Sequence, residues 1–414
     1  MKVGLFFLMQ VPRPWDADSE RRTFDEALEQ VTLADSLGFH HVWSVEHHFL
    51  EEYSHSASPE LFLAAAAMRT KQIRLGHGIV QLPPQINHPV RVAERIAILD
   101  ILSHGRVDFG SGEGSGALEI GTFGVDKETK NAQWEEALGA IVRMFTEEPF
   151  RGIDGRFIQL PPRNVVPKPL QKPHPPLWVA APRPESIVNA ARHGLGSLCF
   201  TLNVEPESAA RIVEYYEAEI LSERLVPIGE NVTPRVACVT PFMCHQDEQT
   251  AIDRGLDGAH FMGFAQGYFY GRGADHEPGT GNLWDEFERE RANAGFDRTL
   301  VNASIDALGA RVEGENGATI RGAIGTPDQI RDFLRRYEEG GVDEVIFFCQ
   351  VGRNRHEHIM EAIELFGREV LPEFAERDPA SEAARSERLG EAIEAGLVRR
   401  AERGPVAESA TAGT

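Results

Sequence analysis

The sequence predicts an α/β protein built as a (β/α)8 TIM barrel, and three observations support this fold class. Eight short apolar runs are each followed by a segment with helical periodicity. The runs are nearly continuous rather than alternating, as expected when a parallel sheet is buried on both faces. The units extend from Val3 to Phe374 in a chain of 414 residues, a length that one barrel with insertions can fill. An open doubly wound sheet is the alternative.

Each predicted element rests on local patterns. Gly38 and Gly194 end two helices, and Ser58 and Thr326 are N-cap residues that precede a proline at the first helical position. The predicted strands are Val3–Met9, His41–Val45, Arg74–Val80, Val107–Gly110, Leu177–Ala180, Gly196–Phe200, Val236–Cys244 and Glu344–Val351. The predicted helices are Thr23–Leu37, Pro59–Thr70, Pro89–Leu102, Thr129–Thr146, Pro184–His193, Pro206–Leu225, one from about Asp247, Thr326–Glu339 and His356–Phe374.

Two stretches interrupt the alternation, after strands four and seven. Residues 150–176 include PPRNVVPKPLQKPHPP, which cannot be helical and predicts a strand and loop excursion. Residues 263–321 hold a glycine-rich loop, GYFYGRGADHEPGTGN, and then helical segments, and an excursion of this size is typical of a lid. We therefore expect one barrel domain at 1–375. Residues 376–414 are expected to form a peripheral helix near Pro379–Arg403 and a disordered tail.

Composition excludes several classes of protein. The 64 acidic and 42 basic residues give a net charge of −22, which disfavours binding to nucleic acid. No window of 18 apolar residues predicts a membrane span. The N-terminal MKVGLFFLMQV lacks a small-residue cleavage pattern, so we interpret it as a buried strand. Four scattered cysteines without a CxxC motif indicate reduced thiols and a cytoplasmic protein.

The strand in VWSVEHHF ends in three titratable residues, Glu46, His47 and His48. Catalytic groups of barrels lie at the C-terminal ends of strands, and only one of two successive histidines can face the mouth. A solvated turn with one packed histidine is the alternative. A metal site is not predicted, because zinc needs three or four convergent ligands and the other cluster, His356-Glu357-His358, diverges at the start of a helix.

Three glycine-containing turns also follow strands. Seven glycines lie between Gly105 and Gly124, where the backbone could approach an anion or a flat ring. Ser115 breaks the GxGxxG spacing of a dinucleotide-binding motif. A mobile loop is the alternative interpretation. The turn from Val179 to Ser186 leads into a helix N-terminus that could bind an anion, with Arg183 adding charge. The segment Gly76-His-Gly-Ile79 indicates backbone pressed against a ligand or an unusual peptide geometry.

Taken together, these segments resemble the flavin-dependent bacterial luciferase-like monooxygenase family. The resemblance covers roughly residues 1 to 375 and keeps the order and spacing of the luciferase α-type chain. Its most specific part is EHHF followed by the segment from HPVR to GRVDFG. The other matching segments are KVGLFFLMQ, RLGHGIVQLPPQIN, FGVD, PPLWVAAPRPES, GTPDQI and MEAIELFGREVLPEF.

The resemblance implies a barrel that binds reduced FMN at its mouth. It implies that His47 is catalytic, supporting formation and protonation of a C4a-(hydro)peroxyflavin, and that Glu46 helps to hold the site. It further implies a cis peptide at Gly78–Ile79, phosphate-binding segments in the FGSGEG loop and the Ala180–Ser186 turn, and a ring-facing aromatic residue. The cofactor-binding residues so implied are Gly78, Ile79, Gly110, Ser111, Gly112, Glu113, Ala180, Ala181, Pro182, Arg183 and Phe200.

The sequence departs from the family at the phosphate site. Where luciferase α chains have a reactive cysteine and an arginine, this chain has Gly112 and Glu113, and a second phosphate-binding arginine falls on Asn131. Both charged anchors are therefore missing, and we expect low flavin affinity. Low affinity suits an enzyme that receives reduced FMN from a separate flavin reductase. The absent cysteine argues against assuming an aldehyde substrate or light emission.

The function best supported at this stage is a two-component monooxygenase that uses reduced FMN and O2 on a small hydrophobic organic substrate. A hydrophobic substrate is suggested by Phe261, Phe264, Tyr268 and Phe269. The alternatives are a deazaflavin (F420)-dependent oxidoreductase and a non-catalytic flavin-binding subunit, with a metallohydrolase last. The resemblance also implies a homodimer formed through the second and third helices.

Overall fold

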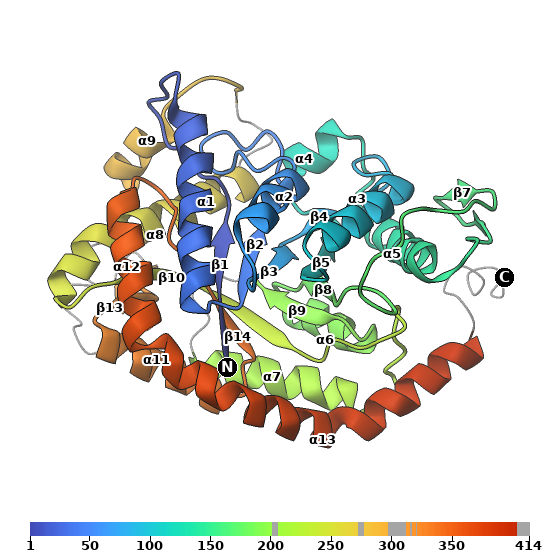
Figure 1. The fold of residues 1–414 in the computed structure, drawn as a ribbon. Helices are drawn as coiled ribbons and strands as arrows, with labels where there is room; N and C mark the ends of the chain where they lie inside the picture. The colour runs from blue at the N-terminus through green and yellow to red at the C-terminus, as the bar shows by residue number, and fades with distance from the viewer. Residues whose placement is uncertain (201–205, 272–276, 297–311, 315–316, 320, 404–414) are drawn as a thin grey trace.

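The structure is a computed structural model that describes residues 1–200, 206–271, 277–296, 312–314, 317–319 and 321–403 (Figure 1). Eight parallel strands form a closed barrel, because β9 pairs with β10 as well as with β8. This confirms the predicted fold class. The barrel strands are β1 (Lys2–Phe7), β2 (His41–Ser44), β3 (Arg74–His77), β5 (Val107–Gly112), β8 (Leu177–Ala180), β9 (Gly196–Cys199), β10 (Val236–Cys244) and β14 (Glu344–Phe348).

Helices cover the outside of the barrel, and most begin within two residues of their predicted positions. The seventh place in this layer is taken by α11, which packs against α7 and α12. The covering helices are α1 (Ser19–Leu37), α2 (Pro59–Arg69), α3 (Pro89–Leu102), α5 (Lys130–Thr146), α6 (Pro184–Arg192), α7 (Pro206–Ile220), α11 (Pro327–Glu339) and α12 (His356–Glu369).

Local sequence explains where these helices start. The Thr326 side chain accepts a hydrogen bond from the backbone N–H of Gln329, and the Gln329 side chain accepts one from the backbone N–H of Thr326, which forms a capping box at α11. Ser58 precedes Pro59 as predicted, but its side chain makes no capping hydrogen bond. The first residues of α5 and α6 follow the ends of β5 and β8, so both N-termini lie at the barrel mouth.

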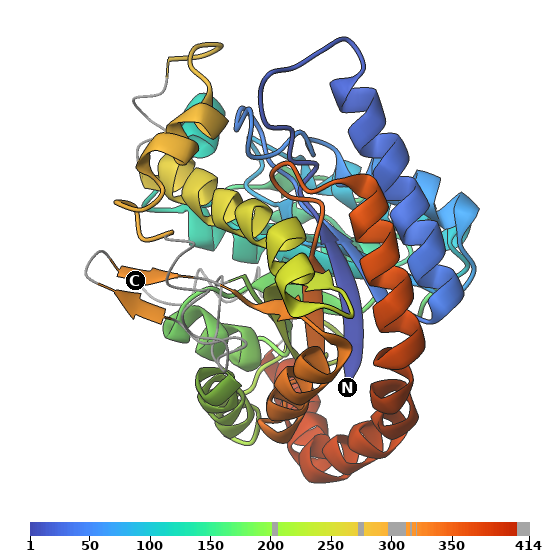
Figure 2. The ribbon, with the colours of Figure 1, turned by 90° about the vertical axis from the view of Figure 1, so that its left-hand side faces the viewer.

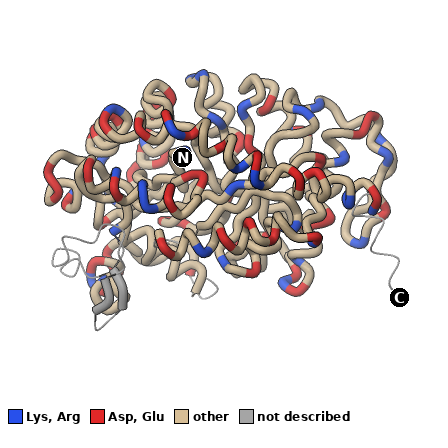
Figure 3. Tube along the Cα trace, turned by 90° about the horizontal axis from the view of Figure 1, so that it is seen from below, with Lys and Arg blue, Asp and Glu red and all other residues tan. Residues whose placement is uncertain are grey.

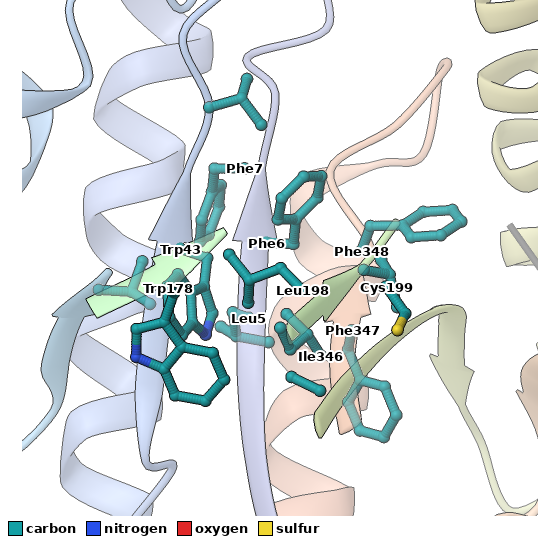
Figure 4. Packing of buried hydrophobic residues seen from close by; sticks show 14 of the residues in the cluster. Leu5, Phe6, Phe7, Trp43, Trp178, Leu198, Cys199, Ile346, Phe347 and Phe348 are labelled. Carbon is teal, nitrogen blue, oxygen red and sulfur yellow. The ribbon is translucent and has the colours of Figure 1, made fainter. Parts of the chain in front are cut away.

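Large side chains fill the barrel interior (Figure 4). Trp43 and Trp178 are fully buried and meet edge to face at 5.3 Å between ring centroids. A Cβ added at Gly76 would lie 2.1 Å from the Trp43 ring, and one added at Gly196 would lie 2.3 Å from the Trp178 ring. Gly76 is therefore a packing residue beneath a tryptophan, and the unusual peptide geometry that was the other expectation for this segment is found at Gly78–Ile79, where the peptide is cis.

Both insertions contain the regular elements that were predicted, strand in the first and helix in the second. The first contains a short antiparallel hairpin of β6 (Ile153–Asp154) and β7 (Gln159–Leu160). In the second, α8 (Glu248–Gly271) continues through residues 263–271, which the sequence assigned to a loop because of their glycines. Figures 1 and 2 show α8 beside α9 (Leu283–Glu290), and Phe261 of α8 packs on Trp284 of α9 at 4.9 Å. Residues 272–276 and 297–311 lie outside the described residues.

Three short strands complete the sheets. β4 (Val80–Gln81) follows β3 and pairs with β5, and β13 (Ala323–Gly325) pairs with the end of β10. β11 (Val312–Gly314) and β12 (Gly317–Thr319) pair with each other.

The C-terminal helix α13 (Leu371–Arg403) lies under the barrel, next to the N-terminus (Figure 1). Lys2 of β1 binds Asp378 at 2.7 Å and also contacts Glu382, so the helix is tied to the first strand. The sequence placed a domain boundary at 375 and a helix start near Pro379. Instead α13 runs continuously through Pro379, because its tertiary contacts outweigh the cost of one proline. The predicted disordered tail at 404–414 lies outside the described residues.

Charged residues of both signs are interspersed over the helices, as the view from below shows (Figure 3). Many of them form ion pairs within or between neighbouring helices, such as Arg335 with Glu373. Among the described residues, no helix combines the length and apolarity needed to cross a bilayer.

Candidate functional site

A cavity of about 630 Å³ opens at the C-terminal ends of the barrel strands. Residues from seven of the eight barrel strands or from the loops that follow them contribute to its wall, together with α8. Of the predicted site residues, ten line the cavity: Glu46, His47, Gly78, Ile79, Gly112, Glu113, Ala180, Pro182, Arg183 and Phe200.

Three predicted residues do not reach this wall. Gly110 lies within β5, where an added Cβ would stand 1.9 Å from the carbonyl oxygen of His77. The Ser111 hydroxyl is buried and accepts a hydrogen bond from Trp134 Nε1 at 3.0 Å. Ala181 is buried and its N–H donates to Leu198 O. Ser111 and Ala181 point away from the cavity because side chains alternate along a strand, and their neighbours Gly112 and Ala180 line it. Gly110 lies on the same side as Gly112 but one step deeper in the barrel.

His47 faces the cavity and His48 does not. His47 Nδ1 lies 3.2 Å from Glu119 Oε1, and no described residue hydrogen-bonds to Nε2. His48 Nε2 instead lies 3.0 Å from Glu46 Oε1, and its ring packs on Phe123 at 5.0 Å. This is the orientation that the alternation along the strand predicts. With Nδ1 held by a carboxylate, Nε2 is the ring atom available for proton transfer.

Glu119 was not found from the sequence. It lies on α4 (Ala117–Thr122), a short helix within the glycine-rich stretch, and its side chain is 1 % exposed. Besides His47, its Oε1 accepts hydrogen bonds from His48 N at 2.9 Å and Gln81 Nε2 at 3.0 Å. Burial alone would raise the pKa of Glu119, but the charge of His47 and these hydrogen bonds lower it, so the carboxylate stays ionised.

Glu46 holds the surrounding loops together. Its carboxylate accepts hydrogen bonds from Gln81 N at 3.0 Å and Asn87 Nδ2 at 2.7 Å, in addition to its contact with His48. Burial opposes the protonation of His48, but the hydrogen bond and charge of Glu46 raise the pKa of His48. The geometry gives Glu46 a supporting place, because His47 is bound by Glu119 instead.

The wall beside β3 is shaped by backbone. The peptide between Gly78 and Ile79 is cis, as the sequence led us to expect. A Cβ added at Gly78 would lie 3.3 Å from both Phe6 and Phe200, whose rings are 4.9 Å apart. At Gly112 an added Cβ would lie 2.7 Å from Ile79 Cδ1. These glycines keep side chains out of a flat space bounded by aromatic and aliphatic groups.

Two helix N-termini and two basic residues border the β5 and β8 side of the cavity. Lys130, the first residue of α5, binds Glu113 Oε1 and Gly114 O, both at 2.7 Å. Arg183 is the N-cap of α6 and is exposed, and no described residue forms an ion pair with it. Unpaired N–H groups at helix N-termini, together with nearby cations, favour an anion. The sequence identified Arg183 but missed Lys130, the residue next to Asn131.

The opposite side, next to β1, β2 and α8, is mostly apolar. Met262, Gln266 and Tyr270 recur every four residues on α8 and face the cavity. Tyr53, from the loop after β2, completes this side. The aromatic residues that suggested a hydrophobic substrate, Phe261, Phe264, Tyr268 and Phe269, are absent from the cavity wall. Phe261 and Phe264 pack against α9, because they lie on another face of the helix.

The family model for luciferase-like monooxygenases matches residues 1–344. The chain belongs to this family. Its relatives include the oxygenase component of a flavin-dependent trigonelline monooxygenase from Acinetobacter baylyi, which is 28% identical over 378 residues, 91% of this chain and 96% of the relative. The monooxygenase RslO1 from Streptomyces bottropensis is similar in structure, with a TM-score of 0.69 and 26% identity over 90% of this chain and 100% of that one.

A second solved structure shares the fold of this chain. It is the oxygenating constituent of 3,6-diketocamphane monooxygenase from Pseudomonas putida, solved with FMN. Its TM-score is 0.66 at 20% identity, and the match covers 90% of this chain and 98% of that one.

Among the described residues, no group of histidine, cysteine, aspartate or glutamate side chains could hold a metal ion.

Proposed function

We propose that this luciferase-like chain is the oxygenase component of a two-component monooxygenase that uses reduced FMN and O2 on a small hydrophobic organic molecule. The observation that carries the proposal is one continuous cavity that joins His47, held by a buried carboxylate, to two helix N-termini beside Lys130 and Arg183. The name of the Acinetobacter relative, an oxygenase component, supports a separate flavin reductase.

The residues of the cavity fit FMN. Its phosphate would lie at the N-termini of α5 and α6, where Lys130 balances the charge of Glu113 and Arg183 adds a second cation. This replaces the missing family arginines and removes the repulsion expected from Glu113. The isoalloxazine ring would lie between Phe6, Ile79 and Phe200, over the two glycines that leave space. When bound, reduced FMN supplies the electrons that activate O2.

The chain itself would position a proton and exclude water. His47 can accept or give a proton at Nε2, while Glu119 fixes its ring through Nδ1 and stabilises the charged form. Apolar side chains around His47 exclude water from the site, which protects the reaction of activated oxygen from side reactions. These side chains are Phe6, Leu8, Val45, Ile79, Phe200, Val239 and Met262.

We further propose a homodimer and a cytoplasmic location. Exposed apolar side chains gather on α2 and α3, with Leu61 71% and Met68 66% exposed, and Ile98, Ile101 and Leu102 beside them. We expect sedimentation to show a dimer that Ile98→Glu converts to monomer, whereas a wild-type monomer would contradict this interface. All four cysteines are buried free thiols, which fits a reducing compartment.

The proposed function can be tested by mixing the protein anaerobically with reduced FMN and then adding O2, with absorbance as the readout. We expect flavin reoxidation to show a phase about tenfold or more slower than that of free reduced FMN. Lys130→Gln should weaken reduced FMN binding about tenfold, because a charged hydrogen bond is worth about 1.5–3 kcal/mol. Lys127→Gln, which changes an exposed lysine outside the cavity wall, is the matched control.

Two results would overturn the proposal. Reoxidation at the rate of free flavin, with no binding of reduced FMN, would show that the cavity does not hold this cofactor. Tight binding of reduced deazaflavin together with hydride transfer, and no reaction with O2, would instead assign a deazaflavin-dependent oxidoreductase.

A further inference from the structure

One polar group of the cavity has no role in the flavin chemistry described above. Tyr53 is 3% exposed and lines the cavity, and its hydroxyl has no hydrogen-bond partner among the described residues. The hydroxyl opens to the cavity and is not sealed in the core, so a molecule in the cavity can reach it. Ligand cavities typically carry a few polar groups of this kind on a mostly apolar wall, where they orient the bound molecule.

The polar groups around Tyr53 make no hydrogen bond with its hydroxyl. Its ring lies 5.5 Å from the His47 ring and 6.3 Å from the Tyr270 ring. The Tyr270 hydroxyl already bonds to Ser115, and Glu119 is engaged by His47, His48 and Gln81. Burial, with smaller effects of Tyr270 and Glu119, raises the pKa of Tyr53 far above its usual range. The phenol therefore stays neutral and can donate a hydrogen bond.

The charges of nearby side chains restrict which ligands the Tyr53 hydroxyl can bind. The basic residues of the wall, Lys130 and Arg183, follow β5 and β8, whereas Tyr53 follows β2 and lies near the ionised Glu119. A carboxylate placed at Tyr53 would be repelled by Glu119 without a cation to balance it. The neighbouring α8 residues, Met262 and Gln266, offer an aliphatic surface and one amide.

We propose that Tyr53 is a substrate-binding residue that donates a hydrogen bond to an acceptor oxygen of an uncharged, otherwise apolar substrate, such as a ketone, beside His47. This deepens the proposed function and rests on it for the identity of the reaction. It assigns specificity to the loop after β2, because an analogue that lacks the oxygen leaves the hydroxyl of Tyr53 unpaired.

The test is a binding measurement in the absence of flavin. Dissociation constants of the full chain would be measured by calorimetry for a panel of monocyclic and bicyclic ketones, each paired with its methylene isostere. We expect at least one ketone to bind about tenfold or more tightly than its isostere. In Tyr53→Phe this preference should disappear through weaker ketone binding, while the isostere binds as before.

Tyr216→Phe is the matched control. Tyr216 is also a fully buried tyrosine, but its hydroxyl donates to Leu195 O at 2.6 Å, far from the cavity wall. This variant should lose stability and keep the ketone preference. Equal binding of every ketone and its isostere, no binding of any ketone, or a preference that survives in Tyr53→Phe would each overturn the inference. Because no flavin is present, these outcomes are independent of the FMN experiment.

Discussion

Strand β2 has a histidine near each end, and the two are surrounded differently. His41 begins the strand at the closed floor of the barrel, fully buried, with Nδ1 2.8 Å from Glu344 and Nε2 3.3 Å from Asp108. His47 follows the other end, and its side chain is 14% exposed, with one carboxylate at Nδ1 and the cavity on its other side. An imidazole closed between two carboxylates can hold charge, whereas one with an open side can exchange a proton.

The floor around His41 is a buried polar network. Asp108 also accepts hydrogen bonds from Trp178 Nε1 at 2.9 Å and Arg74 Nε at 2.5 Å, and Trp43 Nε1 donates to Glu344 at 3.1 Å. Burial opposes a charge on His41, but the two carboxylates outweigh it and raise the pKa of His41. The same strand therefore provides stability at the bottom of the barrel and chemistry at the top, as barrel architecture generally divides them.

The largest effect is expected at the open histidine. His47→Ala should lower the rate of substrate oxygenation about 10²- to 10⁴-fold, the range typical of losing a general acid or base. Product formation with reduced FMN and O2 measures this, and thermal unfolding should change little. His48→Ala is the matched control, because His48 lies outside the cavity wall. Equal losses in both variants would contradict the assignment of His47.

At the floor, a matching change should affect folding instead of chemistry. Asp108→Asn should lower the free energy of unfolding by about 3 kcal/mol, because it removes the buried counter-charge of Arg74 and one of the two carboxylates beside His41. Denaturant unfolding measures the loss. Folded protein should still bind reduced FMN as the wild type does. A loss of FMN binding in protein that remains fully folded would show that the polar network at the floor of the barrel also affects binding at its mouth.

A smaller effect is expected from the carboxylate that holds His47. Glu119→Gln should lower oxygenation about ten- to a hundredfold, because an amide cannot stabilise a charged imidazole as a carboxylate does. Product formation with reduced FMN and O2 measures this loss. A wild-type rate of oxygenation in Glu119→Gln would contradict this role of Glu119.

The smallest effect is a pH dependence of stability from the floor. His41 has a raised pKa, so its contribution is present below 6.5 and is lost as the pH rises through the folded-state pKa. Burial favours the neutral acid at Asp108, but Arg74 and His41 lower its pKa. That contribution is present above 3.8 and is lost as the pH falls. Denaturant unfolding across pH measures both changes. Asp108→Asn should remove the loss of stability that occurs at low pH.

Local sequence patterns were enough to predict the barrel and to place His47 in the site, but not to find Glu119, which holds it. Strands buried on both faces must be apolar, and helices must begin with caps and prolines, so most elements lie near their predicted bounds. Glu119 could not be predicted, because its contact with His47 spans 72 residues. A short helix inside a glycine-rich loop gives no periodic pattern. Placement of α4 over the end of β2 depends on which strands are neighbours.

The sequence by itself determined the fold class, the family resemblance and the position of His47 at a strand end, because each depends on residues close together in the chain. Only the tertiary structure decided that Lys130 balances Glu113, that α8 and α13 continue through glycine and proline, and that Tyr53 has an unpaired hydroxyl at the cavity. These depend on long-range packing, which outweighs local preferences of about 1–3 kcal/mol per residue and sets which side chains meet.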